Sequence, residues 1–230
     1  MKNSNVHADR FGQVWQHFQN GFRPLAYDPE RVAGFDDRKT SLTLSIPISQ
    51  TEIIHKIREI SAKLQGLDGI YLMPEEYYHV TVKWLGFFTD RKEKDYDIEA
   101  DTLDLIIEQA ESVIREVPSF EISLKRLNGL GSFVVCEVND NGAIARLQGR
   151  FHQDATDIPI YPLEGEEWLP HLSLASIKSQ KSISQLQHRI RQFRDVELGT
   201  VQVNEIHLSR AILQQPFPTC TTIHTFQLAN

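Results

Sequence analysis

The sequence predicts an α+β fold built from two copies of a strand–helix–strand–helix–strand unit. Three observations predict it: stretches that alternate apolar and polar residues, stretches with apolar residues at helical spacing, and a repeat of their order along the 230-residue chain. The first strands of the two copies begin at residues 41 and 132, and the strands that start with histidine begin at 79 and 171. The offsets of 91 and 92 residues agree, so the layout is repeated although the sequence itself is not.

The first copy begins with alternating residues in a strand closed by Pro47. A helix follows, with apolar side chains at Ile53, Ile57 and Ile60 and with Gly66 as its stop signal. A long second helix ends before Pro118. The expected elements of this copy are strands over 41–46, 78–85 and 120–127, and helices over 51–65 and 100–117.

The second copy repeats the order. Its expected elements are strands over 132–138, 171–177 and 201–208, and helices over 143–152 and 183–193, with a final strand over 222–228. The two copies define lobes at roughly 41–130 and 131–230. Residues 1–40 form an N-terminal extension that includes a short amphipathic helix over 11–18, and we assign no chemistry to it.

Composition limits the classes of function. A net charge of -7 disfavours a protein that grips long nucleic acid, because such binding needs many contacts from lysine and arginine to phosphates. We therefore expect a small substrate or the end of an RNA. One local group of basic residues is interpreted as a solvated helix face. It consists of Lys178, Lys181, His188, Arg189, Arg191 and Arg194.

Location and cofactors are predicted from what the sequence lacks. No apolar run approaches the roughly 20 residues that span a bilayer, and the N-terminus has no signal-like stretch. The two cysteines, Cys136 and Cys220, show no zinc-site spacing. We therefore expect a cytoplasmic protein that contacts no membrane and uses no metal or other cofactor. We also expect a monomer.

The chemistry is concentrated in two short segments, His79-Val80-Thr81-Val82 and His171-Leu172-Ser173-Leu174. Each reads histidine, apolar, hydroxyl, apolar. Successive side chains of a strand point to opposite faces, so each histidine shares a face with the hydroxyl two residues later. Equivalent positions in the two copies would bring both pairs to a common cleft.

Such a site suits attack at phosphorus without a metal ion. One neutral imidazole removes a proton from water, the other, protonated, donates to the leaving oxygen, and the hydroxyls bind the phosphoryl oxygens. Histidine can take both roles because its unperturbed pKa of about 6.5 makes both charge states accessible. Which of His79 and His171 is the base stays open.

The doubled pattern resembles the 2H phosphoesterase superfamily, which includes 2'-5' RNA ligase-like proteins and 2',3'-cyclic nucleotide phosphodiesterases and whose signature is two copies of His-x-Thr/Ser-x. The resemblance covers roughly residues 41–230. It implies a bilobed structure with mainly antiparallel sheets, a barrel-like core and a central cleft. It also implies His79 and His171 as catalytic residues and Thr81 and Ser173 as phosphate-binding residues. The implied substrate is a nucleotide or RNA end with a 2',3'-cyclic phosphate or a 2'-5' linkage.

Other residues near the two segments are candidate substrate contacts. Lys83 is expected on the face of His79, and Tyr78 and Trp168 are aromatic side chains that could stack on a base. Trp84 is expected on the apolar face, and His207 is interpreted as structural. Two alternatives to hydrolysis stay open: 2'-5' RNA ligation by the same groups in reverse, and a binding module without turnover.

Overall fold

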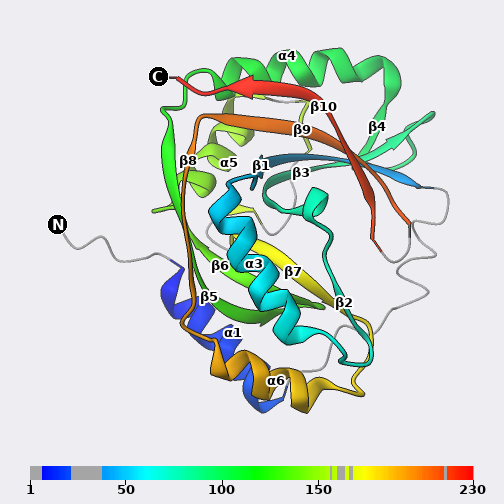
Figure 1. The fold of residues 1–230 in the computed structure, drawn as a ribbon. Coiled ribbons are helices and arrows are strands. Elements are labelled where there is room, and N and C mark those ends of the chain that lie inside the picture. Colours follow the sequence, from blue (N-terminus) through cyan, green and yellow to red (C-terminus); the bar gives the residue numbers. More distant parts are fainter. Residues whose placement is uncertain are drawn as a thin grey trace.

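The computed structural model describes residues 7–21, 38–155, 157–159, 164–165, 168–214 and 217–229. Within this part of the chain, ten strands form one curled, mainly antiparallel sheet, with helices against its outer sides (Figure 1). The α+β class expected from the sequence is therefore confirmed.

The sheet places the two histidine strands side by side at its centre. Eight strands follow one another in the order β10-β9-β1-β3-β7-β6-β5-β8. One half contains β1 (Thr40–Pro47), β3 (His79–Thr89), β9 (Glu205–Ile212) and β10 (Thr219–Gln227). The other half contains β5 (Phe120–Leu130), β6 (Phe133–Asn139), β7 (His171–Ile177) and β8 (Glu197–Val203). The short strand β2 (Ile70–Leu72) pairs with β7, and β4 (Asp97–Glu99) pairs in parallel with β3.

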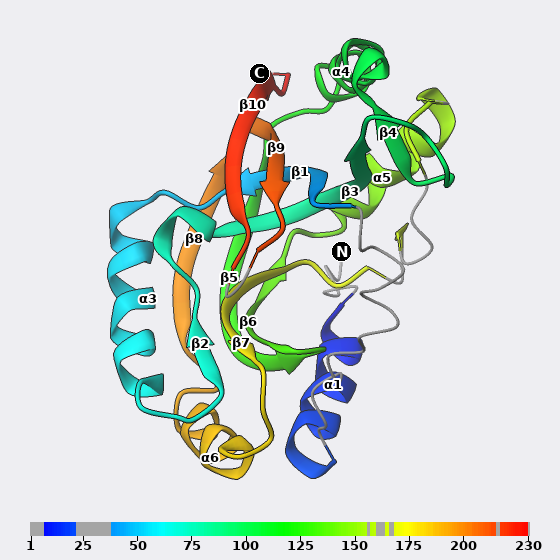
Figure 2. The same ribbon diagram turned by 90° about the vertical axis from the view of Figure 1, so that its right-hand side faces the viewer.

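Helices cover the sheet in two groups, which Figure 2 shows at opposite ends of the molecule. The helix α4 (Leu103–Ile114) contacts α5 (Ala143–Asp154) and β10, while α3 (Thr51–Leu64) contacts β8 and α6 (Ile183–Gln192). Two short 3-10 turns, Glu75–Tyr77 and Ala100–Thr102, precede β3 and α4. None of the described helices is both long and apolar enough to cross a membrane.

The alternation in β1 separates the core from the site. Leu42 and Leu44 are fully buried and belong to the hydrophobic core, whereas the hydroxyls of Ser41, Thr43 and Ser45 line a cavity on the other face. This is the two-faced pattern expected of a half-buried strand. The same strand therefore stabilises the fold and forms part of the cavity wall.

The predicted strand over 201–208 is wrong, because the structure has two strands there. β8 ends at Val203 and pairs with β5, whereas β9 begins at Glu205 and pairs with β1 in the other half of the sheet. The buried positions change from Val201 and Val203 to Ile206 and Leu208. This one-residue slip in alternation is the signal that would have revealed the break.

The passage of the chain from β8 to β9 also interleaves the two halves of the chain in the sheet. β9 and β10, from the end of the chain, lie beside β1, and β5, from the first half, lies beside β6. Strands from the predicted lobes, 41–130 and 131–230, are thus interleaved in one sheet. The division into lobes stays a prediction.

The N-terminal extension contributes a helix that packs onto the domain. α1 (Ala8–Asn20) is longer than the predicted helix, and Phe11 and Phe18 on it are buried. The Asn128 side chain donates a hydrogen bond to the Phe11 carbonyl at 3.0 Å, and the Arg194 guanidinium lies 4.6 Å from the centre of the Trp15 ring. α1 is therefore anchored to β5 and to the segment after α6.

Much of the basic group holds elements together. Arg189 donates to the carbonyls of Lys63 and Gln65 at the end of α3, at 2.9 and 2.8 Å. Arg191 donates to the Gln19 side chain of α1, and Lys181 pairs with Asp68 at 3.2 Å. These contacts favour the structural interpretation of the group over a nucleic-acid surface.

Replacing Gly129 with alanine should destabilise the fold. A Cβ at this position would lie 2.0 Å from a ring carbon of Phe18, which is fully buried and cannot move aside. We expect a loss of about 1–3 kcal/mol in the free energy of unfolding, measured by urea denaturation.

Gly12→Ala is the matched control on α1, because a Cβ there meets nothing within 4 Å. It should stabilise the protein by about 0.5–1 kcal/mol, as alanine does in helix interiors. Equal effects of the two substitutions would contradict the packing of α1 on β5.

Candidate active site

The two histidine strands meet at one antiparallel pair, Val80 on β3 with Leu172 on β7. Both side chains are fully buried in the core. In an antiparallel pair the flanking residues lie opposite one another, so His79 faces Ser173 and Thr81 faces His171. The pairing therefore brings two imidazoles and two hydroxyls together on the face opposite the core.

Each imidazole is oriented by its own backbone. The Nδ1 atom of His79 lies 2.8 Å from the carbonyl oxygen of Tyr77, and Nδ1 of His171 lies 2.7 Å from that of Leu169. A carbonyl only accepts hydrogen bonds, so each Nδ1 carries a proton. Nε2 is then the ring nitrogen that can gain or lose a proton at the site.

Burial lowers the pKa of both histidines. For His79 and His171 alike the loss of hydration is the largest cause, and the carbonyl at Nδ1 partly opposes it. The charge of a protonated His171 lowers the pKa of His79 further, as expected for two groups in one site. Beside them, the ring of Tyr77 lies edge-on to His79 at 5.0 Å, and burial raises the pKa of Tyr77 to about 12.

Both histidines line a cavity of about 610 Å³, which we call the cleft. Its described lining is mainly aromatic, hydroxyl-bearing and imidazole-bearing, with Glu76, Cys220 and four aliphatic residues besides. The aromatic members are Tyr77, Tyr78, Trp84, Phe87 and Trp168; the hydroxyls come from Ser41, Thr43, Ser45, Thr81, Ser209 and Thr222; the imidazoles are His79, His171 and His207. Among the lining residues that the structure describes there is no lysine or arginine.

A β-bulge corrects the predicted orientation of Lys83 and Trp84. The pairing of β1 with β3 steps from Ser45–Thr81 to Leu44–Lys83, which leaves Val82 without an opposite residue. An extra residue reverses the alternation that follows it. Lys83 therefore turns into the interior, where it is fully buried, and Trp84 lines the cleft.

The remaining candidates have different positions. Thr81, Tyr78 and Trp168 line the cleft, although Tyr78 is buried and its hydroxyl lies 3.3 Å from the Met73 carbonyl oxygen. Ser173 is half-buried beside His79 but is not among the residues that line the cleft. The roles of these residues stay predictions.

His207, interpreted from the sequence as structural, also lines the cleft. Its Nε2 lies 2.9 Å from a carboxylate oxygen of Glu205, and its Nδ1 lies 3.3 Å from the hydroxyl of Thr222. Both nitrogens therefore have partners within the protein. The alternation of β9 was the available signal, because His207 and Ser209 share a face opposite Ile206 and Leu208.

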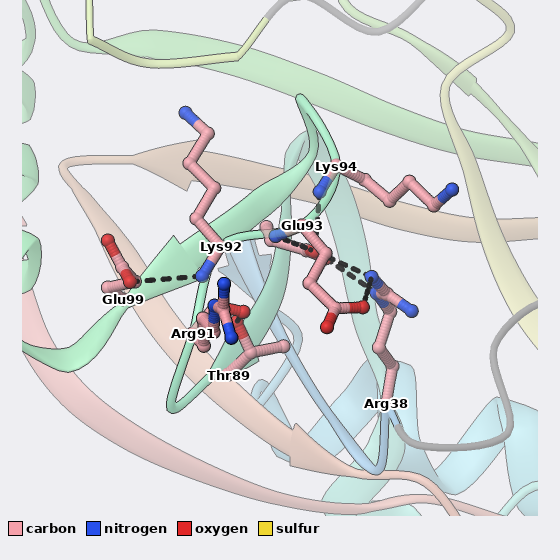
Figure 3. Close-up of polar contacts among 8 residues, drawn as sticks. Arg38, Thr89, Arg91, Lys92, Glu93, Lys94 and Glu99 are labelled. Carbon is pink, nitrogen blue, oxygen red and sulfur yellow. Dashed lines mark hydrogen bonds and ion pairs between the residues drawn. The ribbon is translucent and has the colours of Figure 1, made fainter.

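The loop between β3 and β4 is held together by polar contacts (Figure 3). Asp97 accepts hydrogen bonds from Nε and Nη2 of Arg38, both at 2.6 Å, and from the backbone amides of Glu93 and Lys94. The bond to Arg38 is the largest cause of the lowered pKa of Asp97. The loop carries Tyr96, whose ring lies 5.9 Å from that of Phe87 in the cleft wall.

Comparison with known proteins identifies the class to which this fold and site belong. A model of the 2'-5' RNA ligase superfamily matches residues 44–212, so the chain belongs to that superfamily. The matched segment contains both histidine strands. The resemblance stated from the sequence is therefore confirmed.

Two relatives have archaeal origins and the same name, RNA 2',3'-cyclic phosphodiesterase. The Aeropyrum pernix protein is 30% identical over 144 residues, which cover 56% of this chain and 81% of the relative. The Methanocaldococcus jannaschii protein is 25% identical over 166 residues, which cover 70% of this chain and 88% of the relative.

Solved structures share the fold. Escherichia coli LigT superposes with a TM-score of 0.58 at 17% identity, covering 83% of this chain and 98% of LigT. A protein of unknown function from Agrobacterium tumefaciens has a TM-score of 0.59 at 13% identity and covers 94% of this chain.

Side-chain ¹⁵N NMR should show His79 and His171 as neutral imidazoles at pH 7 with the proton on Nδ1. Burial lowers both pKa values, so both rings should titrate below the ordinary value of 6.5. Assignment comes from His79→Gln and His171→Gln, each of which removes one set of signals. A proton on Nε2 would contradict the hydrogen-bond geometry, and titration above 6.5 would contradict the effect of burial.

Proposed function

We propose that this chain is a cyclic phosphodiesterase that hydrolyses 2',3'-cyclic phosphates in RNA ends or small nucleotides, with His79 and His171 as its acid/base pair. The observation that carries the proposal is the convergence of the two imidazoles on one face of the β3–β7 pair, each held through Nδ1. The names of the two archaeal relatives favour the cyclic phosphate over a 2'-5' linkage.

The charge of the cleft supports a substrate of low negative charge. Its described lining offers hydroxyls and imidazoles but no lysine or arginine, and one carboxylate, Glu76, is present. A cyclic phosphate carries a single negative charge, which one imidazolium can neutralise. A chain of phosphates usually requires several guanidinium or ammonium groups. The lining therefore suits one phosphodiester at the end of a molecule.

The proposed reaction needs two proton transfers. The unprotonated Nε2 of one histidine takes a proton from water, whose oxygen forms a bond to phosphorus. The bond from phosphorus to one ribose oxygen breaks, and that oxygen takes the proton from Nε2 of the other histidine. The cyclic diester becomes a phosphate monoester beside a free hydroxyl, and the two histidines have exchanged roles.

Thr81 is positioned to help bind the phosphoryl group. It lines the cleft and lies opposite His171 across the strand pair, so its hydroxyl can donate to a phosphoryl oxygen. Such donors are already oriented before the reaction and stabilise charge that develops on oxygen. Ser173, opposite His79, is the proposed counterpart.

His79→Ala and His171→Ala should each lower kcat/KM for a 2',3'-cyclic nucleotide by about 10²- to 10⁴-fold, because each removes one proton-transfer group. The assay contains a chelator, and wild-type turnover should persist in it. His188→Ala is the control, because His188 is exposed on α6. Binding without turnover by the folded wild type would favour the binding module, and ligated product would favour the ligase.

The pH profile of kcat/KM should be bell-shaped with its maximum below pH 6.5. One histidine must be neutral and the other protonated, so the active fraction is greatest midway between their two pKa values. Burial lowers both values, which places the midpoint below 6.5. An optimum well above 7 would contradict the assignment of both roles to these histidines.

A further inference from the structure

We infer that Glu164 is a positioning residue. Its buried carboxylate joins the strand of the first histidine to the segment that leads into the second, and thereby fixes the Leu169 carbonyl that orients His171. The catalytic part of this inference rests on the proposed function.

The ionic contact begins at the β-bulge. Lys83, turned inward after Val82, places Nζ at 2.6 Å from a carboxylate oxygen of Glu164, and Nε2 of His152 on α5 lies 2.6 Å from the same oxygen. The side chains of Lys83 and Glu164 are 0% and 1% exposed. Burial lowers the pKa of Lys83, and Glu164 opposes that shift.

A second bridge runs parallel to the first. Gln148 on α5, which is fully buried, donates to the Val82 carbonyl at 2.6 Å and accepts from the Gly165 amide at 2.8 Å. Adjacent residues of β3, Val82 and Lys83, are thus tied to adjacent residues of the α5–β7 segment, Glu164 and Gly165. Gly165 has a φ of +80°, which glycine adopts without strain.

Glu164 and Gly165 lie a few residues before the part of the chain that contacts His171. The Gly165 carbonyl accepts from the Trp168 amide at 3.1 Å, and Trp168 lines the cleft. The next residue, Leu169, supplies the carbonyl that lies 2.7 Å from Nδ1 of His171. A displacement at Glu164 therefore reaches His171 through a short series of hydrogen-bonded residues.

Stability alone is a poor reason for this arrangement. A buried ion pair contributes little net stability, because desolvation of both charges offsets their attraction, and an apolar pair of similar volume is often as stable. Positioning is a better reason, because an ion pair with short hydrogen bonds fixes the geometry of its partners more closely than apolar contacts do. Residues that orient metal-binding histidines change activity by about 10- to 100-fold when they are removed, and we take that range as the scale for a residue that orients a catalytic histidine.

The test is Glu164→Gln, which keeps the shape of the side chain and removes its charge. We expect kcat on a 2',3'-cyclic nucleotide to fall by about 10- to 100-fold with a smaller change in KM. The pKa of His171, followed by side-chain NMR, should fall further because a looser bond to Leu169 stabilises the imidazolium less. The pKa of His79 should change less, since its Tyr77 carbonyl lies on the other segment and only the coupling to His171 reaches it.

Two further variants keep the result interpretable. Glu116→Gln removes an exposed ion pair with Arg150 and should change neither kcat nor either pKa. Lys83→Met combined with Glu164→Leu replaces the buried pair with apolar groups; it should fold and still show the kinetic defect. Folded variants with wild-type kcat and an unchanged pKa of His171, or equal shifts of both histidines, would overturn the inference. The NMR result needs no substrate, so it stands separately from any failure of the proposed activity.

Discussion

The pairing of β3 with β7 through Val80 and Leu172 is the constraint on which the rest of the site depends. It places apolar side chains of both strands in the core and both histidines on the opposite face, so the interaction that stabilises the centre of the sheet also builds the site. The flanking strands β1 and β6, which lie on either side of this pair, reproduce the layout in both halves. Each half supplies one imidazole whose orientation is set within two residues of its own strand.

Periodicity predicted most of the fold because most elements have one buried face. The helices α3, α5 and α6 and the strands β1, β5, β6 and β7 lie within a few residues of their predicted bounds. Periodicity did not predict the bounds of a strand where those bounds depend on which neighbouring strand it pairs with. The break at Asn204 separates two strands that pair in different halves of the sheet, and the short strands β2 and β4 offer too few residues for a period. The anchoring of α1 depends on the space that Gly129 leaves for Phe18, a contact between distant residues.

The site was predictable to the extent that a strand alternates without interruption. From His79 to Thr81 the alternation holds, and both residues line the cleft. One bulge at Val82 then reverses the predicted faces, so that Lys83 points into the interior and Trp84 points into the cleft. A bulge is set by how β1 pairs with β3, which no local pattern encodes. The same event gives Lys83 its partner Glu164, 81 residues away in sequence, so the failed prediction and the proposed positioning role have one physical origin.

The central claim is that His79 and His171 act as one acid/base unit. A double-mutant cycle on kcat/KM for a 2',3'-cyclic nucleotide tests it most directly, with His79→Ala, His171→Ala and the double variant compared at one pH. Groups that act as a unit are strongly non-additive, so we predict that the double variant is about as slow as the slower single variant. If the two losses instead multiplied, each histidine would contribute independently, and the paired mechanism would be contradicted.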